Sequence, residues 1–519
     1  MIIMNLRIFI TGLILFMNHS LTAQFTNIQI GGPLSNWAPN EPSICINPNN
    51  PNEIIVGANI DNYYISIDGG QTWQHEILES PFGVNCDPVI ITDKSNNFYY
   101  FHLVPDLSRV VCHKKNGILS PWSEVTFTAY DENKDVDKEW AVFDPVTGNI
   151  YLTWSRFDVY GSSNPQDSTF IFFSKSADGG LTWSEQKLIS NRGGNAQGGL
   201  MSVHGSCPAT GPDGEVYVTW WDPAGLMFDK SNDEGETWLE TDINVTGFPI
   251  AWIYTIPGIE LGVSFPIIAC DRSNGPNHGT IYINWADKRS GSSNSDIWLV
   301  KSTDGGITWT EPIMVNDGPA GRHQFFNHMT IDQVTGKIYI IFYDRRNYTD
   351  QNTDVYVAIS DDGGESFTNH KISNTPFFPY YTVFFGHYIG ISADDDHVFA
   401  TWMRMDSGEL SLWGTAIDPG TVTIEEKSSK PFSLLQNSPN PFLEYTFFSF
   451  KLEKSCYVSL NVIDPIGHKI ATLIDNVKMD KGKHTISFIP EKYNLLPGVY
   501  YYSLVSNQQT IVKKMVYSK

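Results

Sequence analysis

From residue 25 onward, apolar and polar residues alternate in short runs, which predicts β-strands and almost no helix. The clearest runs are rich in Tyr, Val and Trp and recur as the second strand of a repeated module; they lie at 53–60, 98–104, 149–155, 215–221, 280–286, 337–343 and 397–403. One strand precedes each run and two follow it. The pattern predicts an all-β fold built from a repeated four-stranded unit.

A phrase of eight residues lies between the third and fourth strands of most modules and occurs five times. Its copies are SIDGGQTW at 66–73, SADGGLTW at 176–183, SNDEGETW at 231–238, STDGGITW at 302–309 and the looser SDDGGESF at 360–367. Asp and Ser side chains can bond nearby backbone N–H groups, and Gly supplies the positive φ of a tight turn. The closing Trp is expected to bury its ring against the hairpin that it ends. We call this phrase the clasp, and we assign a structural role to its aspartates, Asp68, Asp178, Asp233, Asp304 and Asp362.

The spacing of the clasps sets the number of modules. Successive clasps begin 110, 55, 71 and 58 residues apart, so the first gap holds two modules. The extra module lies at 87–125, and a last module without a clasp lies at 386–417. Seven modules are therefore favoured over six. The unpaired strand at 25–30 is expected to supply the missing fourth strand of the last module, because such closure removes exposed sheet edges.

The clasp resembles the Asp box of sialidase-like (BNR-repeat) β-propellers. The resemblance implies an Asp-box β-propeller over residues 24–418, with seven blades favoured and six as the alternative. Residues 38–417 are also similar to a broader set of secreted sialidase-like propellers, through NEPS at 40–43, DKEW at 137–140 and YDRR at 343–346. The motif says how blades are built and does not itself assign a reaction.

The two ends of the chain differ from the repeat. Arg7 precedes an apolar run at 8–17, which predicts a secretory signal peptide over 1–23; a membrane anchor is the alternative. A polar linker is expected at 419–430. Residues 431–519 resemble the type A C-terminal sorting domain of the Bacteroidetes type IX secretion system, through SPNPF at 438–442, DPIG at 464–467 and LPGVY at 496–500. That implies a small Ig-like β-sandwich, contact with the type IX machinery, and a secreted or outer-membrane-surface location. A carbohydrate-binding sandwich is the alternative.

Composition excludes several classes of partner. A net charge of −23 argues against binding to nucleic acid or anionic membranes. Six Cys are too few for a disulfide scaffold and form no Cys-x-x-Cys zinc motif, although isolated disulfides stay open. We expect a monomer with no cofactor and no catalytic metal. The run Asp394-Asp395-Asp396 leaves a structural calcium open, with a solvated turn as the alternative reading.

Geometry of a four-stranded blade places the clasps on one face of the disc. The opposite face collects the starts of the inner strands and the loops after the second strands, so it is the default ligand site. The candidate catalytic carboxylates there are Glu41, Asp87, Glu139, Asp287 and Asp344. The candidate ligand-binding residues are Arg156, Arg289, Arg345, Arg346, Arg404, His387 and Tyr388. His204 and His323 are candidate acid/base groups or metal ligands, or else packed polar residues.

Five of the nine arginines after residue 23 follow second strands, where guanidinium forks could bind carboxylates. The alternative is an ion-pair girdle, in which Asp287 or Asp344 of one blade bonds an Arg of the next. The sialidase resemblance implies three substrate-binding Arg, a Tyr nucleophile backed by Glu, and an Asp acid. Here Glu41-Pro42-Ser43 occupies the position of the first of those Arg, which argues against sialidase activity; Tyr343, Tyr381 and Tyr388 are the candidate nucleophiles.

These observations favour a protein directed at extracellular glycans or glycoproteins. A glycoside hydrolase would need two carboxylates about 5–10 Å apart at the inner-strand starts. The alternative is a non-catalytic propeller that binds carbohydrate or protein in adhesion.

Overall fold

The structure is a computed structural model that describes residues 25–35, 37–247, 253–291, 293–419, 432–452, 454–465, 468–493, 495–506 and 509–518. The expected signal peptide (1–23), linker residues 420–430 and two residues of the 464–467 motif lie outside these ranges. The described chain consists of β-strands and turns, with a short 3-10 helix at Pro490–Tyr493. The predicted all-β class is confirmed. The chain divides after Asp418 into two units.

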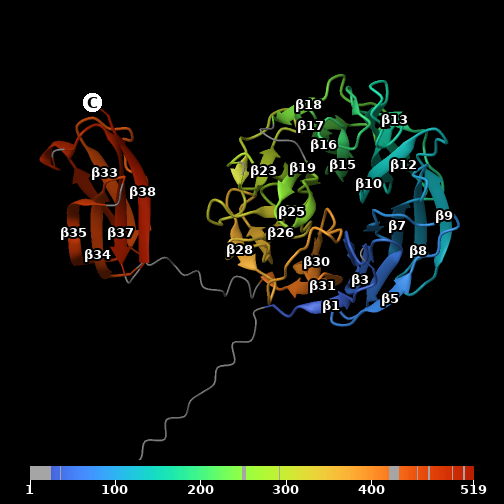
Figure 1. Cartoon of the computed structure of the whole chain (residues 1–519), viewed down its shortest axis with the longest axis horizontal. Coiled ribbons are helices and arrows are strands. Elements are labelled where there is room, and N and C mark those ends of the chain that lie inside the picture. Colours follow the sequence, from blue (N-terminus) through green and yellow to red (C-terminus); the bar gives the residue numbers. More distant parts are fainter. Residues whose placement is uncertain are drawn as a thin grey trace, which may run out of the picture. The chain divides into compact units, whose positions relative to one another are not determined.

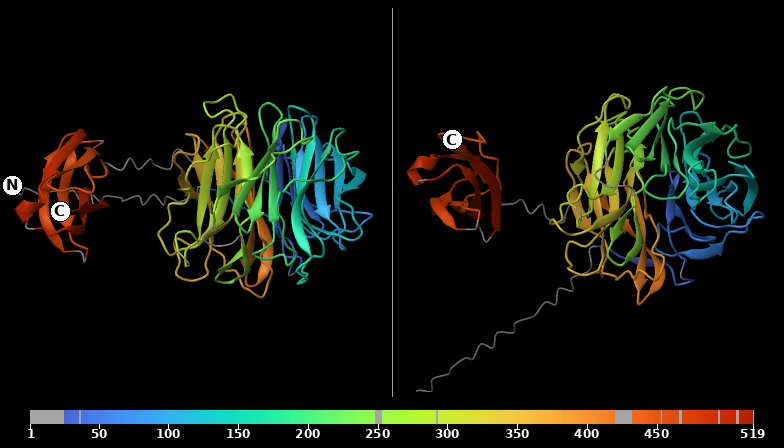
Figure 2. Two further views of the ribbon diagram at one scale, coloured as in Figure 1. Left: turned by 90° about the horizontal axis from the view of Figure 1, so that it is seen from above. Right: turned by 45° about the horizontal axis from the view of Figure 1, so that its top comes forward.

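Four-stranded sheets of the first unit radiate from a common centre (Figure 1). Their strands run through the thickness of a disc (Figure 2). The first three sheets are β2 (Ser43–Asn47), β3 (Asn50–Ala58), β4 (Asn62–Ser66) and β5 (Gln74–Ile77); β6 (Val89–Thr92), β7 (Asn97–Leu103), β8 (Val110–Asn116) and β9 (Trp122–Thr128); and β10 (Asp135–Phe143), β11 (Ile150–Phe157), β12 (Ser168–Ser176) and β13 (Lys187–Leu188), with β14 (Gly194–Asn195) on β12.

The second half of the ring repeats this order. Its sheets are β15 (His204–Thr210), β16 (Val216–Asp222), β17 (Gly225–Ser231) and β18 (Ile243–Thr246); β21 (Ile267–Cys270), β22 (Ile281–Asp287), β23 (Asp296–Ser302) and β24 (Ile313–Met314); β25 (Gln324–Ile331), β26 (Ile338–Asp344), β27 (Asp354–Ser360) and β28 (Thr368–Lys371); and β29 (Gly390–Asp394), β30 (His397–Asp406), β31 (Glu409–Ile417) and β1 (Ile28–Gly31). A separate hairpin, β19 (Ile253–Ile256) and β20 (Ile259–Val263), follows β18.

Closure of the ring uses both ends of the unit. In the described residues, the inner strands β2, β6, β10, β15, β21, β25 and β29 contact one another in this order, and β29 contacts β2. The N-terminal strand β1 pairs with β31 in antiparallel register, with Ile28 opposite Gly414. The expected fourth strand of the last module is therefore the N-terminal one, and it leaves β31 with no open edge.

Each clasp is held by its own side chains. In the first copy, the Gly70 N–H donates to Ser66 Oγ at 2.8 Å, and the Thr72 N–H and hydroxyl donate to the Asp68 carboxylate at 2.9 and 2.6 Å. The same pattern recurs at the other four clasp aspartates. Bonds from the Thr237 hydroxyl and N–H lower the pKa of Asp233 to about 2. The aspartates therefore have the structural role that the sequence indicates.

The clasp also joins neighbouring blades, which the sequence pattern did not predict. Gly306 lies against Phe228 of the preceding blade, and an added Cβ would be 2.3 Å from that ring. Trp309 meets the same ring edge-on at 5.1 Å, while its indole N–H donates to the Gly306 carbonyl. Lys230, also of the preceding blade, donates to the Gly305 carbonyl at 2.8 Å. The Trp thus packs across the blade boundary, and it also donates a hydrogen bond to its own turn, which the sequence pattern did not specify.

The second unit has two sheets and its own core. Their strands are β32 (Phe432–Leu434), β33 (Thr446–Leu452) and β36 (Gly482–Phe488), and then β35 (Lys469–Met479), β34 (Cys456–Ile463), β37 (Gly498–Ser506) and β38 (Gln509–Tyr517). Buried residues of both sheets form one apolar cluster, in which Phe448 stacks on Tyr502 with ring centroids 4.3 Å apart. This arrangement is a small β-sandwich.

Two further findings bear on the composition. All six cysteines lie in described residues and are free thiols, so none forms a disulfide in this structure. Over the described part of the chain, no helix has the length and apolar character needed to cross a membrane.

Candidate functional site

A single backbone position recurs at the start of every inner strand. It lies two residues before a residue that pairs with the second strand, and we call its occupant the lead-in residue. The lead-in residues are Glu41, Asp87, Lys138, Gly205, Phe265, Phe326 and Tyr388. Five of them have a φ between 49° and 70°, which an ordinary strand does not contain. This departure from strand geometry, repeated around the ring, brings charged side chains to one place.

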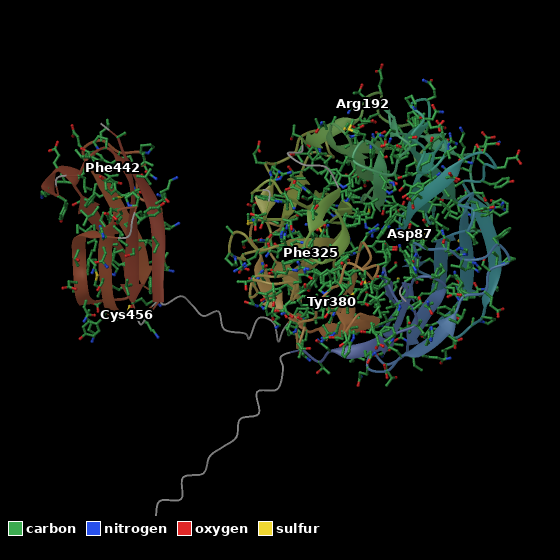
Figure 3. The ribbon with its side chains drawn as sticks, in the orientation of Figure 1. Asp87, Arg192, Phe325, Tyr380, Phe442 and Cys456 are labelled. Atoms are coloured by element: carbon green, nitrogen blue, oxygen red, sulfur yellow. The ribbon has the colours of Figure 1, made fainter. Side chains whose placement is uncertain are left out.

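A cavity of about 470 Å³ is lined by four of the lead-in residues, Glu41, Asp87, Lys138 and Phe265. Its lining residues are Trp37, Glu41, Asn59, Ile60, Asn85, Cys86, Asp87, Asp137, Lys138, Tyr160, Gly198, His204, Leu261, Val263, Phe265, Phe384 and His387. Figure 3 shows Asp87 toward the middle of the ring and Arg192 at its periphery. The structure thus brings two candidate catalytic carboxylates, Glu41 and Asp87, and the candidate ligand residue His387 into one cavity.

Glu41 is held as an ionised carboxylate. Asn59 Nδ2 donates to its Oε2 at 2.6 Å, and the His387 N–H donates to its Oε1 at 3.1 Å. The ring Nδ1 of His387 lies 3.2 Å from the same oxygen. Burial raises the pKa of Glu41, but the bonds and charge of His387 and the charge of Lys138 outweigh it, so the pKa lies below its usual value.

Asp87 is shifted in the opposite direction. Burial raises its pKa above the usual value, and the charge of Glu41 adds to this, while Lys138 opposes it. The Tyr388 hydroxyl donates to its Oδ1 at 3.2 Å, and Asn59 Oδ1 accepts the Asp87 N–H at 3.1 Å. Asn59 therefore links Glu41 to Asp87. Two titratable groups whose pKa values are pushed apart are the usual mark of an acid and a base.

Asp137 and Glu139 add further acidic groups beside this pair. Asp137 lines the cavity, and burial and the charge of Asp87 raise its pKa well above the usual value. Its Oδ2 lies 3.6 Å from His204 Nε2. Glu139 is fully buried, and among described residues neither of its carboxylate oxygens has a hydrogen-bond partner. Burial and Asp87 raise its pKa too. Glu139 is not among the lining residues, which sets it apart from Glu41 and Asp87.

Aromatic side chains form part of the cavity wall and rim. Trp37 is 58% exposed and packs on Phe384 with ring centroids 5.1 Å apart. Tyr160, on the loop after β11, is 44% exposed. Exposed aromatic faces in a cavity that buried acids also line suit a ligand with both apolar and hydroxyl surfaces.

The arginines after the second strands lie outside this cavity. Arg289 forms a bidentate pair with Asp287, with Nη2 2.7 Å from Oδ2, and Arg346 pairs with Asp344 at 2.7 Å. Each pair is two residues apart on one strand end, where side chains share a face. The alternative of a girdle between blades is therefore wrong for Asp287 and Asp344, and Asp344 bonds Arg346 rather than Arg345.

The remaining arginines also have partners elsewhere. Arg345 donates to Thr353 Oγ1 and to the Pro257 carbonyl, at 3.0 and 2.7 Å. Arg156 lies over the Phe172 ring, with Cζ 3.5 Å from its centroid. Arg404 bonds Asp406 and the Thr375 hydroxyl. The structure does not gather these side chains into a site for an anionic ligand.

Other candidates from the sequence are structural or lie apart. Tyr343 is fully buried and donates to the Met403 carbonyl, and Tyr381 is 70% exposed. His323 bonds Ser295 Oγ at 3.0 Å away from the cavity. Asp394–Asp396 forms the turn between β29 and β30, where the Asp396 N–H donates to Asp332. Among described residues, no group of three or more His, Cys, Asp or Glu side chains is placed to hold a metal.

Sequence reasoning missed Asn59, Trp37 and Tyr160. Asn59 follows β3 and acts through its bonds to two lead-in segments, which no motif reveals. Trp37 precedes the first module and carries no repeat signal. An acidic residue precedes a proline in both Glu41-Pro42 and Asp87-Pro88, and this recurrence was the available signal that the two positions are equivalent.

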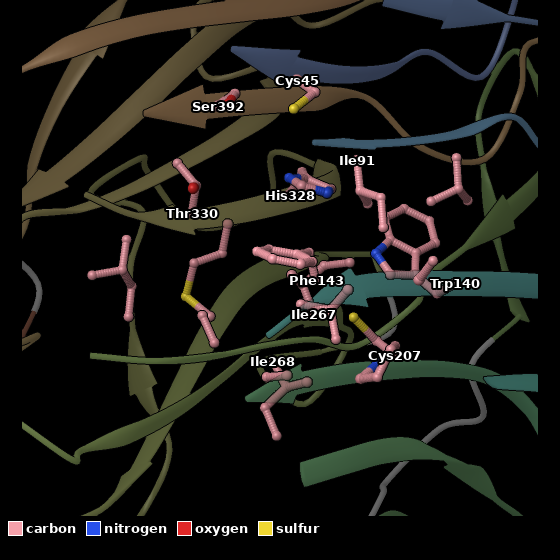
Figure 4. Close-up of a pocket in the computed structure, with 18 of the residues that line it drawn as sticks. Cys45, Ile91, Trp140, Phe143, Cys207, Ile267, Ile268, His328, Thr330 and Ser392 are labelled. Carbon is pink, nitrogen blue, oxygen red and sulfur yellow. The ribbon is translucent and has the colours of Figure 1, made fainter. Parts of the chain in front are cut away.

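A second hollow, of about 320 Å³, follows the axis of the ring among the inner strands. Figure 4 shows side chains of several inner strands converging there, among them Cys45, Trp140, Cys207 and His328. His328 and Trp140 lie with ring centroids 5.7 Å apart, and Trp140 meets Tyr388 edge-on at 5.6 Å. Trp140 and His328 line the hollow, and Tyr388 in turn bonds Asp87 of the cavity.

Comparison with protein families matches residues 64–75 to the BNR/Asp-box repeat. The chain carries a BNR/Asp-box repeat. A search of curated proteins by sequence found no match.

Solved structures of similar shape include two sialidases and a lyase. The NanB sialidase of Streptococcus pneumoniae has 10% identity and a TM-score of 0.44, over 71% of this chain and 84% of that one. An ulvan lyase of a polysaccharide lyase family, bound to a uronic acid–rhamnose sulfate unit, has 13% identity and a TM-score of 0.44, over 75% of this chain and 94% of that one. A Hadza microbial sialidase has 14% identity and a TM-score of 0.39, over 71% of this chain and 73% of that one. At these identities and TM-scores, the likeness assigns no activity or substrate to this chain.

Proposed function

We propose that this protein acts on extracellular glycans and that the cavity at the lead-in residues hydrolyses a glycosidic bond. The observation that carries the proposal is the pairing of Glu41 and Asp87: they line one cavity, share Asn59, and have pKa values shifted in opposite directions. Among the described residues, no arginine bonds either carboxylate, in contrast to Asp287 and Asp344. Hydrolysis of a glycoside requires one protonated and one ionised carboxyl group.

In this mechanism, Asp87 is the acid and Glu41 is the base. Asp87 gives its proton to the glycosidic oxygen as the bond from that oxygen to the anomeric carbon breaks. Glu41 takes a proton from the water that adds to the anomeric carbon, and both groups then return to their starting states by exchange with solvent. The hydroxyl of Tyr388 orients Asp87, and Asn59 with His387 orients Glu41.

A panel of fluorogenic glycosides, including an α-sialoside, tests the proposal on the purified chain from residue 24. We expect release from at least one glycoside, reduced about 10²–10⁴-fold by Glu41→Gln or Asp87→Asn. Asp406→Asn, a carboxylate paired with Arg404 away from the cavity, is the matched control and should keep full activity. Activity that survives both cavity substitutions would disprove the assignment.

A non-catalytic glycan-binding propeller is the second candidate. It is favoured by the bonds on Glu41, since both of its carboxylate oxygens already accept hydrogen bonds. In that case the whole panel is inert, while glycans still bind and Trp37→Ala, at the rim, weakens their binding.

We also propose that the protein is exported as a monomer and that the second unit is a sorting domain for the type IX secretion machinery. The motifs at 438–442 and 496–500 support this, as does a β-sandwich with its own apolar core. Deletion of residues 431–519 should then retain the propeller inside the cell envelope, as fractionation would measure. Calcium binding at Asp394–Asp396 stays a separate hypothesis.

A further inference from the structure

The charges that line the cavity are unequal. Three carboxylic acids, Glu41, Asp87 and Asp137, face a single side chain with an ammonium group, Lys138. The five arginines that follow the second strands are not among the lining residues. An anionic ligand would therefore depend on Lys138 or on the two histidines that line the cavity.

Lys138 is caged by aromatic rings. Its Nζ lies 3.7 Å from the ring centroid of Tyr388, 4.4 Å from that of Trp140 and 5.3 Å from that of Phe265. The residue is 3% exposed, and its Nζ is buried without a hydrogen-bond partner among the described residues. The rings stabilise the ammonium by cation–π contact, and burial leaves almost none of the side chain open to a ligand in the cavity.

The two histidines are engaged as well. His204 Nδ1 bonds Ser155 Oγ at 2.9 Å, and burial together with the charge of Lys138 lowers its pKa to about 3, so the ring is neutral near pH 7. His387 Nδ1 lies 3.2 Å from the carboxylate of Glu41. A ligand carboxylate or sulfate would thus find acids close by and no accessible cation.

From this geometry we infer that the cavity selects uncharged sugar residues and rejects carboxylated or sulfated ones. The inference rests on the proposed function and narrows its substrate class. Hydroxyl groups can both donate and accept, so they match a surface of ionised and protonated carboxyl groups. A negatively charged ligand would be repelled by the ionised Glu41, which is buried and therefore weakly screened by solvent, and such repulsion is a common source of specificity.

Calorimetric titration of the chain from residue 24 with matched glycan pairs tests this inference. Each pair differs by one carboxylate, as galactose-terminated and galacturonate-terminated oligosaccharides do. For the pair that binds, we expect at least tenfold tighter binding of the neutral member. Equal or tighter binding of the acidic member would overturn the inference.

A gain-of-function variant provides the second arm. Leu261, on β20, lines the cavity and is 36% exposed, so Leu261→Arg would introduce a cation that a ligand can reach. It should reduce the preference for the neutral sugar at least fivefold, whereas the control Leu261→Gln should leave it unchanged. Hydrolysis of an acidic glycoside by the unaltered protein would refute this inference alone. Absence of both binding and hydrolysis across all pairs would refute the proposed function and the inference together.

Discussion

Substitution of the second glycine of a clasp by alanine is expected to destabilise the propeller through the contact between blades. Gly306 has a φ of +86°, and an alanine Cβ there would lie 2.3 Å from a ring atom of Phe228. The left-handed backbone costs a residue with a Cβ about 1–2 kcal/mol, and overpacking of a buried ring costs about 1–3 kcal/mol. We therefore expect Gly306→Ala to lower the free energy of unfolding by about 3 kcal/mol.

Gly305, its neighbour in the same turn, provides the control. Its φ of +70° gives a similar backbone cost, but the nearest atom to an added Cβ is the flexible Nζ of Lys230 at 3.4 Å. We expect Gly305→Ala to cost about 1–2 kcal/mol, the backbone contribution alone. The difference between the two variants measures the steric contact with the preceding blade.

Urea titration followed by tryptophan fluorescence is the assay. All 15 tryptophans precede Asp418, so the signal reports on the propeller and not on the second unit. Truncation of the ring in Phe228→Leu should reduce the extra cost of Gly306→Ala, because the alanine then has room. Equal losses for Gly305→Ala and Gly306→Ala would refute the view that the clasp locks one blade to the next.

Three further predictions concern charge. Arg346→Met leaves the fully buried Asp344 without its cation, so thermal or chemical denaturation should show a loss of about 3–5 kcal/mol; glycan binding measured by calorimetry should not change. If Asp87 is the acid, the rate of hydrolysis should fall as the pH rises through the raised pKa of Asp87. If Glu41 is the base, the rate should also fall as the pH decreases through the lowered pKa of Glu41. A pH–rate profile without the fall at high pH would contradict this assignment. Asp233, with its folded pKa lowered to about 2 from 3.8, stabilises the fold above the higher value; the difference in melting temperature between the protein and Asp233→Asn should therefore shrink as pH falls from 3.8 toward 2, whereas a constant difference would exclude the linkage.

Much of the fold follows from local pattern, and much of the site does not. The alternation of apolar and polar residues and the spacing of the clasps predict the strands and the turns, because these depend on residues near one another in sequence. The N-terminal closing strand was predictable because the last module lacked a fourth strand. The packing of Trp309 on Phe228 escaped prediction, since it depends on how adjacent blades approach. The bond from Lys230 to the clasp carbonyl of Gly305 in the next blade also escaped prediction, for the same reason.

For the site, residue type was a weaker guide than backbone position. Asp87 and Glu41 were expected among five carboxylates, but only equivalence of the lead-in residues explains why these two share a cavity while Asp344 is tied to Arg346. Five arginines do follow second strands in the sequence, but in the structure each guanidinium contacts a partner outside the cavity. Lys138 belongs to a motif that the sequence singled out. Its cage combines Trp140, two residues away on the same strand, with Phe265 and Tyr388, which are far away in the chain.

Pairing of β1 with β31 imposes an order on biosynthesis. The strand that a ribosome makes first in the ring must wait, unpaired, until the strand made last is available. A nascent or translocating chain therefore exposes the edge of its final blade until both ends meet, and factors that hold it open have one defined edge to protect. Loss of a few residues at the start of the propeller would remove β1 and so destabilise the last blade, although the other strands of that blade are intact.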